Sequence, residues 1–330
     1  MKLLVDIEKL EAQGTVTAAQ AAAIRRAGAA ETVSLVVNAI LSLGVIAVVA
    51  GVIALQPGTG AMAVLGGGLA LAGLLMRLLR TESFGFLGGA LLLVGALLHG
   101  AAALAEFQGG MAGFAYVAAL YFALGALARQ GLMIALSVFA LAGLLGSSTG
   151  YWHASYGLWV REPTFTIAAF GLLAAAALAA APKLGAAHRR LAQVFAAICV
   201  VWANFGFWVG SLWGDHPGSS WARAELLYSD TYIADRYQRL QDWYAQALAV
   251  PAGAFALAWA AALLGLGAWA AANNRRGLVN AAATFASIHF FTQWFERLKT
   301  APETVIAAGA LAVAIAFALW RYNRKAPAAA

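Results

Sequence analysis

The chain has 330 residues, of which 63% are hydrophobic and 11% are charged. A chain so rich in apolar residues is an integral membrane protein and not a pair of soluble domains. The net charge of +7 would suggest a nucleic-acid partner in a soluble protein, but the cations stand beside the ends of apolar segments, where orientation in a bilayer accounts for them. We therefore expect the lipid bilayer as a partner and no nucleic acid.

Residues 1–32 precede the first apolar stretch and carry the signals of two short helices. An amphipathic stretch up to Leu10 is followed by Gly14, which suits a helix stop. Thr17 and Gln20 then have the spacing of a capping box, which indicates the start of a second helix. We expect a short cytoplasmic helical hairpin as a lead-in to the membrane domain.

Ten nearly uncharged stretches follow, and each is long enough to cross a hydrocarbon core of ~30 Å as a helix. They fall at residues 33–55, 61–79, 83–105, 111–128, 131–147, 164–181, 191–213, 246–272, 278–295 and 303–320. The predicted fold class is an all-α polytopic membrane helix bundle. Its single integral domain covers 33–325, and 326–330 form a disordered tail.

The distribution of lysine and arginine sets the predicted orientation. With the N-terminus inside, 15 of the 21 basic residues face the cytoplasm and 6 face the other side. This bias satisfies the positive-inside rule and places both termini in the cytoplasm.

The loop 214–245 is the one long external segment in this topology. Within it, Asp230 can cap a helix whose apolar and aromatic residues repeat at offsets of four, seven and eleven from Ile233. We expect a periplasmic helix near 230–245 that lies along the interface. The tryptophans close to this level, including Trp208, are typical of an aromatic belt.

Glycines recur in the second and third predicted spans, where they favour close packing of two membrane helices. The residues concerned are Gly66, Gly67, Gly68, Gly73, Gly85 and Gly89.

Ionisable side chains inside lipid are costly and are therefore the natural functional candidates. His99 and His289 lie at similar predicted depth in the third and ninth spans, and Glu106 and Glu296 end the same two helices. Asp215, His216 and His153 belong to the adjoining outer loops. If the two helices are neighbours, these groups form a polar vestibule open to the periplasm, able to exchange protons or to hold a cation or polar ligand. The alternative is that each histidine only hydrogen-bonds a neighbouring helix.

Asn204 and Trp208 in the seventh span add an amide and an indole that could line a pathway, although interhelical hydrogen bonding explains them equally well. A haem held between His99 and His289 is a further alternative, and no other cofactor is expected. The single cysteine, Cys199, excludes an intrachain disulfide and a thiol pair for metal binding.

Catalytic motifs such as HExxH, a P-loop or a nucleophile elbow are absent from the sequence, so nothing predicts an enzyme. We expect transport or binding of a small molecule or ion at the periplasmic face. The alternative is an accessory subunit that packs against another membrane protein or against a second copy of the chain.

Two segments resemble a known family. The run Leu10-Glu11-Ala12-Gln13-Gly14-Thr15-Val16-Thr17, with Ala18, Ala19 and Gln20 after it, is similar to the lead-in of the bacterial membrane family catalogued as domain of unknown function 2157. The stretch from Asn280 to Lys325 looks like that family's final helix pair, with Gln293-Trp294-Phe295-Glu296 where the family often has an Arg-Tyr-Phe-Glu-like sequence. The resemblance implies a bundle in the bacterial inner membrane and supplies no catalytic residues.

Overall fold

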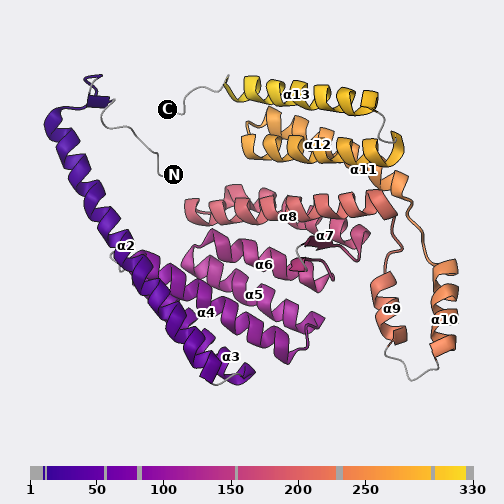
Figure 1. The fold of residues 1–330 in the computed structure, drawn as a ribbon, viewed down its shortest axis with the longest axis horizontal. Coiled ribbons are helices and arrows are strands. Elements are labelled where there is room, and N and C mark those ends of the chain that lie inside the picture. The colour runs from indigo at the N-terminus through magenta and orange to yellow at the C-terminus, as the bar shows by residue number, and fades with distance from the viewer. Residues whose placement is uncertain are drawn as a thin grey trace. The chain divides into compact units, whose positions relative to one another are not determined.

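The computed structural model describes residues 10–11, 13–55, 58–79, 84–152, 155–227, 233–298 and 302–324, and it is about 86% helical. The chain is therefore built mainly from α-helices, as the sequence predicts (Figure 1). It divides into two compact units, Met1–Ala128 and Arg129–Ala330, which are described separately below.

The helices of the first unit whose bounds are described are α2 (Ala18–Leu55), α3 (Thr59–Leu78), α4 (Gly85–Glu106) and α5 (Met111–Ala128). The capping box at the start of α2 is confirmed: the backbone N–H of Thr17 donates to Oε1 of Gln20 at 2.9 Å, and the N–H of Gln20 donates to Oγ1 of Thr17 at 3.3 Å. The helix that begins there continues through the first predicted span as one element of 38 residues. No proline interrupts it, so nothing removes a helical hydrogen bond at the predicted end of the lead-in.

Helices α3 and α4 pack together through glycines. A Cβ atom on Gly73 would collide with the backbone of Leu92, and one on Gly95 would collide with the backbone of Ala70. The predicted packing role is confirmed for Gly66 and Gly73 on α3. It is wrong for Gly68 on α3 and for Gly85 on α4, which both face open space. On α4 the contact with α3 uses Gly88 and Gly95 instead.

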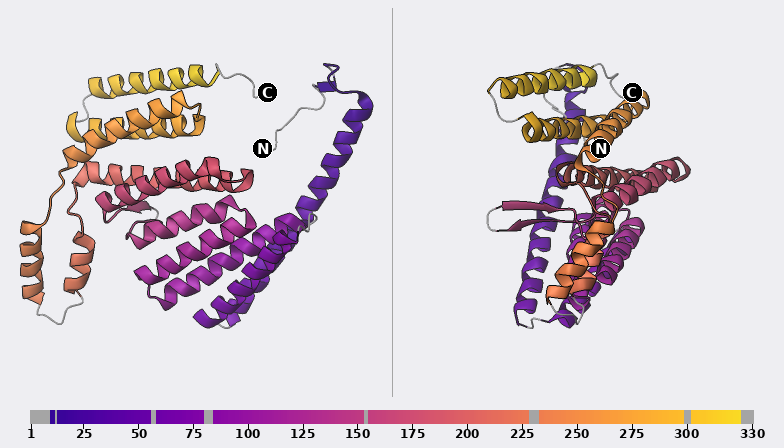
Figure 2. Two further views of the ribbon diagram at one scale, coloured as in Figure 1. Left: turned by 180° about the vertical axis from the view of Figure 1, so that it is seen from behind. Right: turned by 90° about the vertical axis from the view of Figure 1, so that its right-hand side faces the viewer.

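The second unit begins with α6 (Gly131–Leu144), an antiparallel hairpin of β1 (Ser148–Trp152) and β2 (Ser155–Trp159), and α7 (Pro163–Ala180) with the 3₁₀ turn η2 (Ala181–Lys183). The hairpin projects away from the helices of this unit (Figure 2). The sequence does not predict this hairpin, although the chain as a whole keeps its all-α character. Residues 148–159 are rich in Ser, Thr, Tyr and Trp, and β-branched and aromatic side chains favour strands. Consequently α6 ends earlier than its predicted span and has 14 residues.

The remaining helices are α8 (Ala186–Trp213), α9 (Ser219–Leu227), α10 (Ile233–Gln246), α11 (Ala252–Ala272), α12 (Arg276–Leu298) and α13 (Pro302–Arg324). Helix α10 confirms the predicted helix in the external loop, but Asp230, its predicted cap, lies outside the described residues. Helix α9 is missing from the prediction. The span predicted from residue 246 begins at Ala252, because Pro251 adopts an extended conformation and forms the N-cap of α11.

The core of the second unit is built around two tryptophans. The Trp202 ring on α8 is fully buried and packs edge-on against two phenyl rings. Its centroid lies 5.6 Å from that of Phe205 and 5.5 Å from that of Phe139. Trp259 on α11 is also fully buried and packs with Leu263 and Phe285. These large rings fix α8 and α11 in register and thereby position Asn204 between them.

Six helices in the described part of the chain are long and apolar enough to cross a membrane. They are Thr59–Leu78, Gly85–Glu106, Met111–Ala128, Pro163–Lys183, Ala186–Trp213 and Ala252–Ala272. A membrane protein is thus supported, whereas the count of ten spans stays a prediction.

Candidate functional site

His99 joins three helices of the first unit. Its Nδ1 lies 2.8 Å from the carbonyl oxygen of Ala63 on α3, and its Nε2 lies 2.7 Å from the hydroxyl of Tyr116 on α5. Both ring nitrogens therefore have hydrogen-bond partners. The packing interpretation of His99 accounts for these contacts without a ligand.

The same histidine also borders a pocket of about 340 Å³ at the ends of α3, α4 and α5. Glu106 lines this pocket with His99, because seven residues of helix return the chain to the same face about 10 Å further along. The Thr59 hydroxyl lies 3.5 Å from Oε2 of Glu106 at its rim. An imidazole, a phenol, a hydroxyl and a carboxylate are thus gathered around one opening.

This set of groups can bind a cation or exchange a proton with water. The Glu106 side chain is exposed and offers carboxyl oxygens, and imidazole nitrogens can donate or accept a proton. Iron ligation by His99 would require the loss of its contact with Ala63 or with Tyr116, because a ligating nitrogen must offer its lone pair to the metal. Among the described residues, no group of three or more His, Cys, Asp or Glu side chains could hold a metal ion.

His289 has different surroundings. Its ring packs edge-on against Trp259 with the centroids 4.8 Å apart, and it borders a groove of about 600 Å³ between α11 and α12. The other residues that line this groove are apolar. Glu296, two turns further along α12, is exposed and is not among the lining residues. His99 belongs to the first unit and His289 to the second, so their proximity stays a prediction.

Asn204 is buried and serves an interhelical hydrogen bond. Its Nδ2 donates to the carbonyl oxygen of Val200 at 2.8 Å, and its Oδ1 accepts the Nε1–H of Trp259 at 2.8 Å. Trp208 is half-buried one turn further along α8, and its ring packs 6.5 Å from that of Phe205. These two candidates therefore lie within the helix packing of the second unit.

A pair of buried carboxylates lies near the start of α7. Asp215 was among the groups expected near the vestibule, whereas Glu162 was not predicted. Glu162 is fully buried and accepts the N–H of Gly218 at 2.7 Å, the N–H of Ser220 at 2.7 Å and the hydroxyl of Ser220 at 2.5 Å. Asp215, also buried, accepts the N–H of Thr164 at 2.9 Å. Each acid thus accepts hydrogen bonds from backbone N–H groups at the start of a helix, where these groups have no partner within the helix. That helix is distant from the acid in sequence.

A sequence signal for this arrangement exists. Pro217 and Gly218 precede Ser219 and Ser220, which is a typical start of a helix, and Pro163 occupies the first position of α7 directly after Glu162. The partnership between the two sites depends on tertiary contact and is not visible in the sequence. Because backbone amides donate to both carboxylate oxygens of Glu162 and to Oδ2 of Asp215, we assign this pair a structural role. His153, which the predicted topology also places at this side, lies outside the described residues.

No family model matches this chain, and no curated protein or solved structure matches it either. The resemblance to the family catalogued as domain of unknown function 2157 therefore stays a prediction.

Proposed function

We propose that this chain is an integral membrane protein that binds a small cation or polar solute in the pocket of His99, Glu106 and Tyr116. We further propose that it transports this ligand across the membrane. The observation that carries the proposal is the presence of both His99 and Glu106 at one pocket, together with Thr59 and Tyr116. Ionisable side chains within a bilayer are costly unless they serve a ligand or each other. In this pocket the Glu106 carboxyl group stays exposed.

The proposed topology has ten spans, cytoplasmic N- and C-termini, and a location in a bacterial inner membrane. The pocket then opens to the periplasm, since it lies between the start of α3 and the end of α4. Reporter fusions test this orientation: a periplasmic signal from a fusion at the C-terminus, or a cytoplasmic signal from one in the loop around Tyr228, would contradict it.

A thermal-stability screen of the purified full chain in detergent tests binding. The probes are Na⁺, K⁺, Zn²⁺, ethanolammonium and choline, because a ligand that binds only the folded state raises its melting temperature. At least one probe should stabilise the wild type, and His99→Ala and Glu106→Gln should each lose that shift. His188→Ala, an exposed residue at the start of α8, is the control and should respond like the wild type.

Two results would refute the binding proposal. One is the absence of a shift with every probe, and the other is an equal shift in all variants, which would indicate binding elsewhere. A visible absorbance spectrum of the same preparation tests the haem alternative, since a bound haem gives a strong band.

An accessory role is the second candidate, and an exposed face of α11 favours it. Ala254, Ala258, Ala261, Gly265 and Ala268 repeat every three or four residues on this helix and are all exposed. Small residues at this spacing allow another membrane helix to approach closely. An accessory subunit predicts stoichiometric co-purification with a membrane protein, lost in Gly265→Leu, whereas the binding proposal predicts no such dependence.

A further inference from the structure

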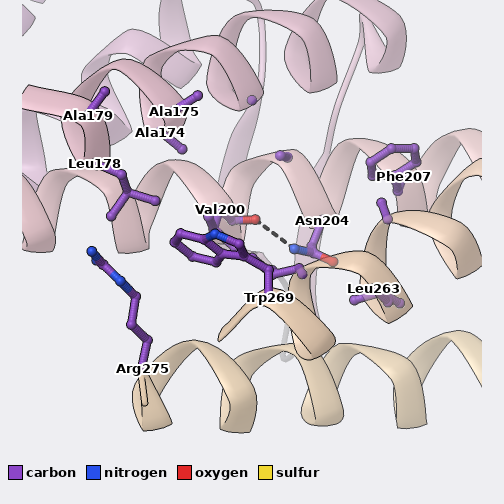
Figure 3. A pocket seen from close by; sticks show the side chains of 14 residues that line it. Ala174, Ala175, Leu178, Ala179, Val200, Asn204, Phe207, Leu263, Trp269 and Arg275 are labelled. Carbon is purple, nitrogen blue, oxygen red and sulfur yellow. Dashed lines mark hydrogen bonds between the residues drawn. The ribbon is translucent and has the colours of Figure 1, made fainter. Parts of the chain in front are cut away.

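An apolar groove lies between α7, α8 and α11 in the second unit and ends at a single cation. Its volume is about 530 Å³, and Arg275 is the one charged residue among the 14 that line it. Figure 3 shows the Arg275 side chain near Leu178 and Trp269 at one end and Phe207 at the opposite end. The volume falls in the range of sites that hold a single small molecule.

The amide group of Asn204 inside the groove has its partners within the protein. The Nδ2 group of Asn204 donates to Val200, and its Oδ1 accepts from Trp259. An occupant therefore needs no polar groups along this stretch, and an alkyl chain fits it better than a polar solute.

Arg275 lies at the level where a membrane helix leaves the hydrocarbon. Helix α11 ends at Ala272, and the guanidinium carbon of Arg275 sits 5.2 Å from the ring centroid of Trp269. Tryptophan and basic residues concentrate at this boundary, and the indole face holds the cation in place. The charged end of the groove thus coincides with the predicted headgroup level.

The length of the groove matches one leaflet. Its α7 wall runs from Gly171 to Ala179, which is about 12 Å of helix, against about 15 Å for half of a ~30 Å hydrocarbon core. Gly171, Ala175 and Ala262 are exposed along it, so the groove is open along its side. A lipid in the surrounding bilayer can therefore enter laterally.

We propose that this groove binds one anionic phospholipid of the bilayer, with an acyl chain along the apolar walls and the phosphate at Arg275. The charge of Arg275 selects an anionic headgroup, since basic side chains beside membrane helices attract anionic lipids. The site is independent of the pocket at His99 and adds a lipid requirement to the protein.

Native mass spectrometry of the purified full chain tests the proposal with two lipids of equal chain length, dioleoyl phosphatidylglycerol and dioleoyl phosphatidylcholine. The wild type should retain phosphatidylglycerol preferentially. Arg275→Ala should weaken phosphatidylglycerol binding about five-fold, because one interfacial cation is lost. It should weaken phosphatidylcholine binding less, because the choline cation already offsets the charge of that lipid's phosphate. Arg275→Lys should restore most of the preference.

A second variant tests the groove independently of charge. A Cβ atom on Gly171 meets nothing within 4 Å, so Gly171→Leu fills the groove without a collision and should reduce the binding of both lipids. Gly265 on α11 has the same free space and does not line the groove, so Gly265→Leu should bind both lipids like the wild type. Arg190→Ala, which removes an exposed cation from α8, controls for general charge.

Equal retention of the two lipids by the wild type, or unchanged binding in Gly171→Leu, would overturn the proposal. So would displacement of phosphatidylglycerol by inorganic phosphate alone, which would show that Arg275 binds free anions and that the groove takes no acyl chain. A protein that co-purifies with the wild type but not with Gly171→Leu would assign the groove to a partner helix instead.

Discussion

The carboxylate of Glu162 binds Ser220 twice, through the backbone N–H at 2.7 Å and through the hydroxyl at 2.5 Å. These residues stand 58 positions apart, with the whole of α7 and α8 between them. The contact therefore anchors the first turn of α9 beside the start of α7. Asp215, just after α8, accepts the backbone N–H of Thr164 in the first turn of α7. The start of α7 and the segment between α8 and α9 are therefore joined by two carboxylates, one from each segment.

We predict that Glu162→Gln destabilises this junction. The substituted amide keeps one acceptor oxygen but turns an NH₂ group toward backbone N–H groups that already donate, leaving a buried donor unsatisfied. Such a loss costs about 1–3 kcal/mol. A lower melting temperature of the purified protein and faster proteolytic cleavage between α9 and α10 are the expected results.

The matched control for Glu162→Gln is Glu225→Gln. Glu225 lies on α9 but is exposed, so its loss of charge should change neither measurement. If both substitutions lower the melting temperature equally, the effect belongs to net charge and not to the buried contact.

The glycine contact of α3 with α4 gives a second prediction. Gly73→Ala introduces a methyl group against the backbone of Leu92, so the helices must separate along their contact. Forced separation of a packed pair costs about 1–3 kcal/mol. Gly68→Ala on the same helix meets nothing within 4 Å and should be neutral or slightly stabilising. Melting temperatures of the two variants in one detergent distinguish a packing effect from a propensity effect.

Local patterns in the sequence predict the helices well, and tertiary contacts explain the errors. Six of the predicted apolar stretches, the capping box at Thr17 and the helix α10 all depend on neighbouring residues and are confirmed. The glycine register on α4 requires knowledge of which face meets α3, so Gly88 and Gly95 were missed. The hairpin β1–β2 was missed because residues 148–159 are too few and too polar to cross a membrane and therefore resemble a loop between two spans.

The candidate site follows the same division. That His99 and Glu106 share a pocket follows from their spacing on one helix. The partners of Asn204 and Glu162 come from helices far away in the chain, and no local pattern in either residue's neighbourhood identifies them.

The hydrogen bond of Trp259 to Asn204 gives a third prediction, tested by a double-mutant cycle. Asn204→Leu leaves the buried indole N–H of Trp259 without its acceptor, so this single variant should lose about 1–3 kcal/mol. Trp259→Phe removes the donor as well as ring surface. The double variant should lose less than the sum of both, with a coupling of about 0.6–2 kcal/mol, as for hydrogen bonds between membrane helices. Strictly additive losses in denaturation assays would show that the bond contributes nothing.

The turn after α8 gives the last prediction, because Gly214 has a backbone conformation that other residues avoid. Its φ is 71° and its ψ is −166°, a region accessible essentially to glycine alone. A Cβ atom there would lie 2.7 Å from the carbonyl oxygen of Val250, the residue that pairs with Asp215.

Gly214→Ala should therefore destabilise the protein by about 1–3 kcal/mol through backbone strain alone. It should also loosen the Asp215–Val250 bridge, which hydrogen exchange of the Asp215 and Val250 amides would report, since each donates to the other's carbonyl at 2.9 and 2.8 Å. Gly265→Ala adds the same methyl group within a helix where nothing lies within 4 Å, and it should be neutral or stabilising by up to about 1 kcal/mol. Equal stability of the two variants would mean that the turn after α8 relaxes freely and does not fix the position of Asp215.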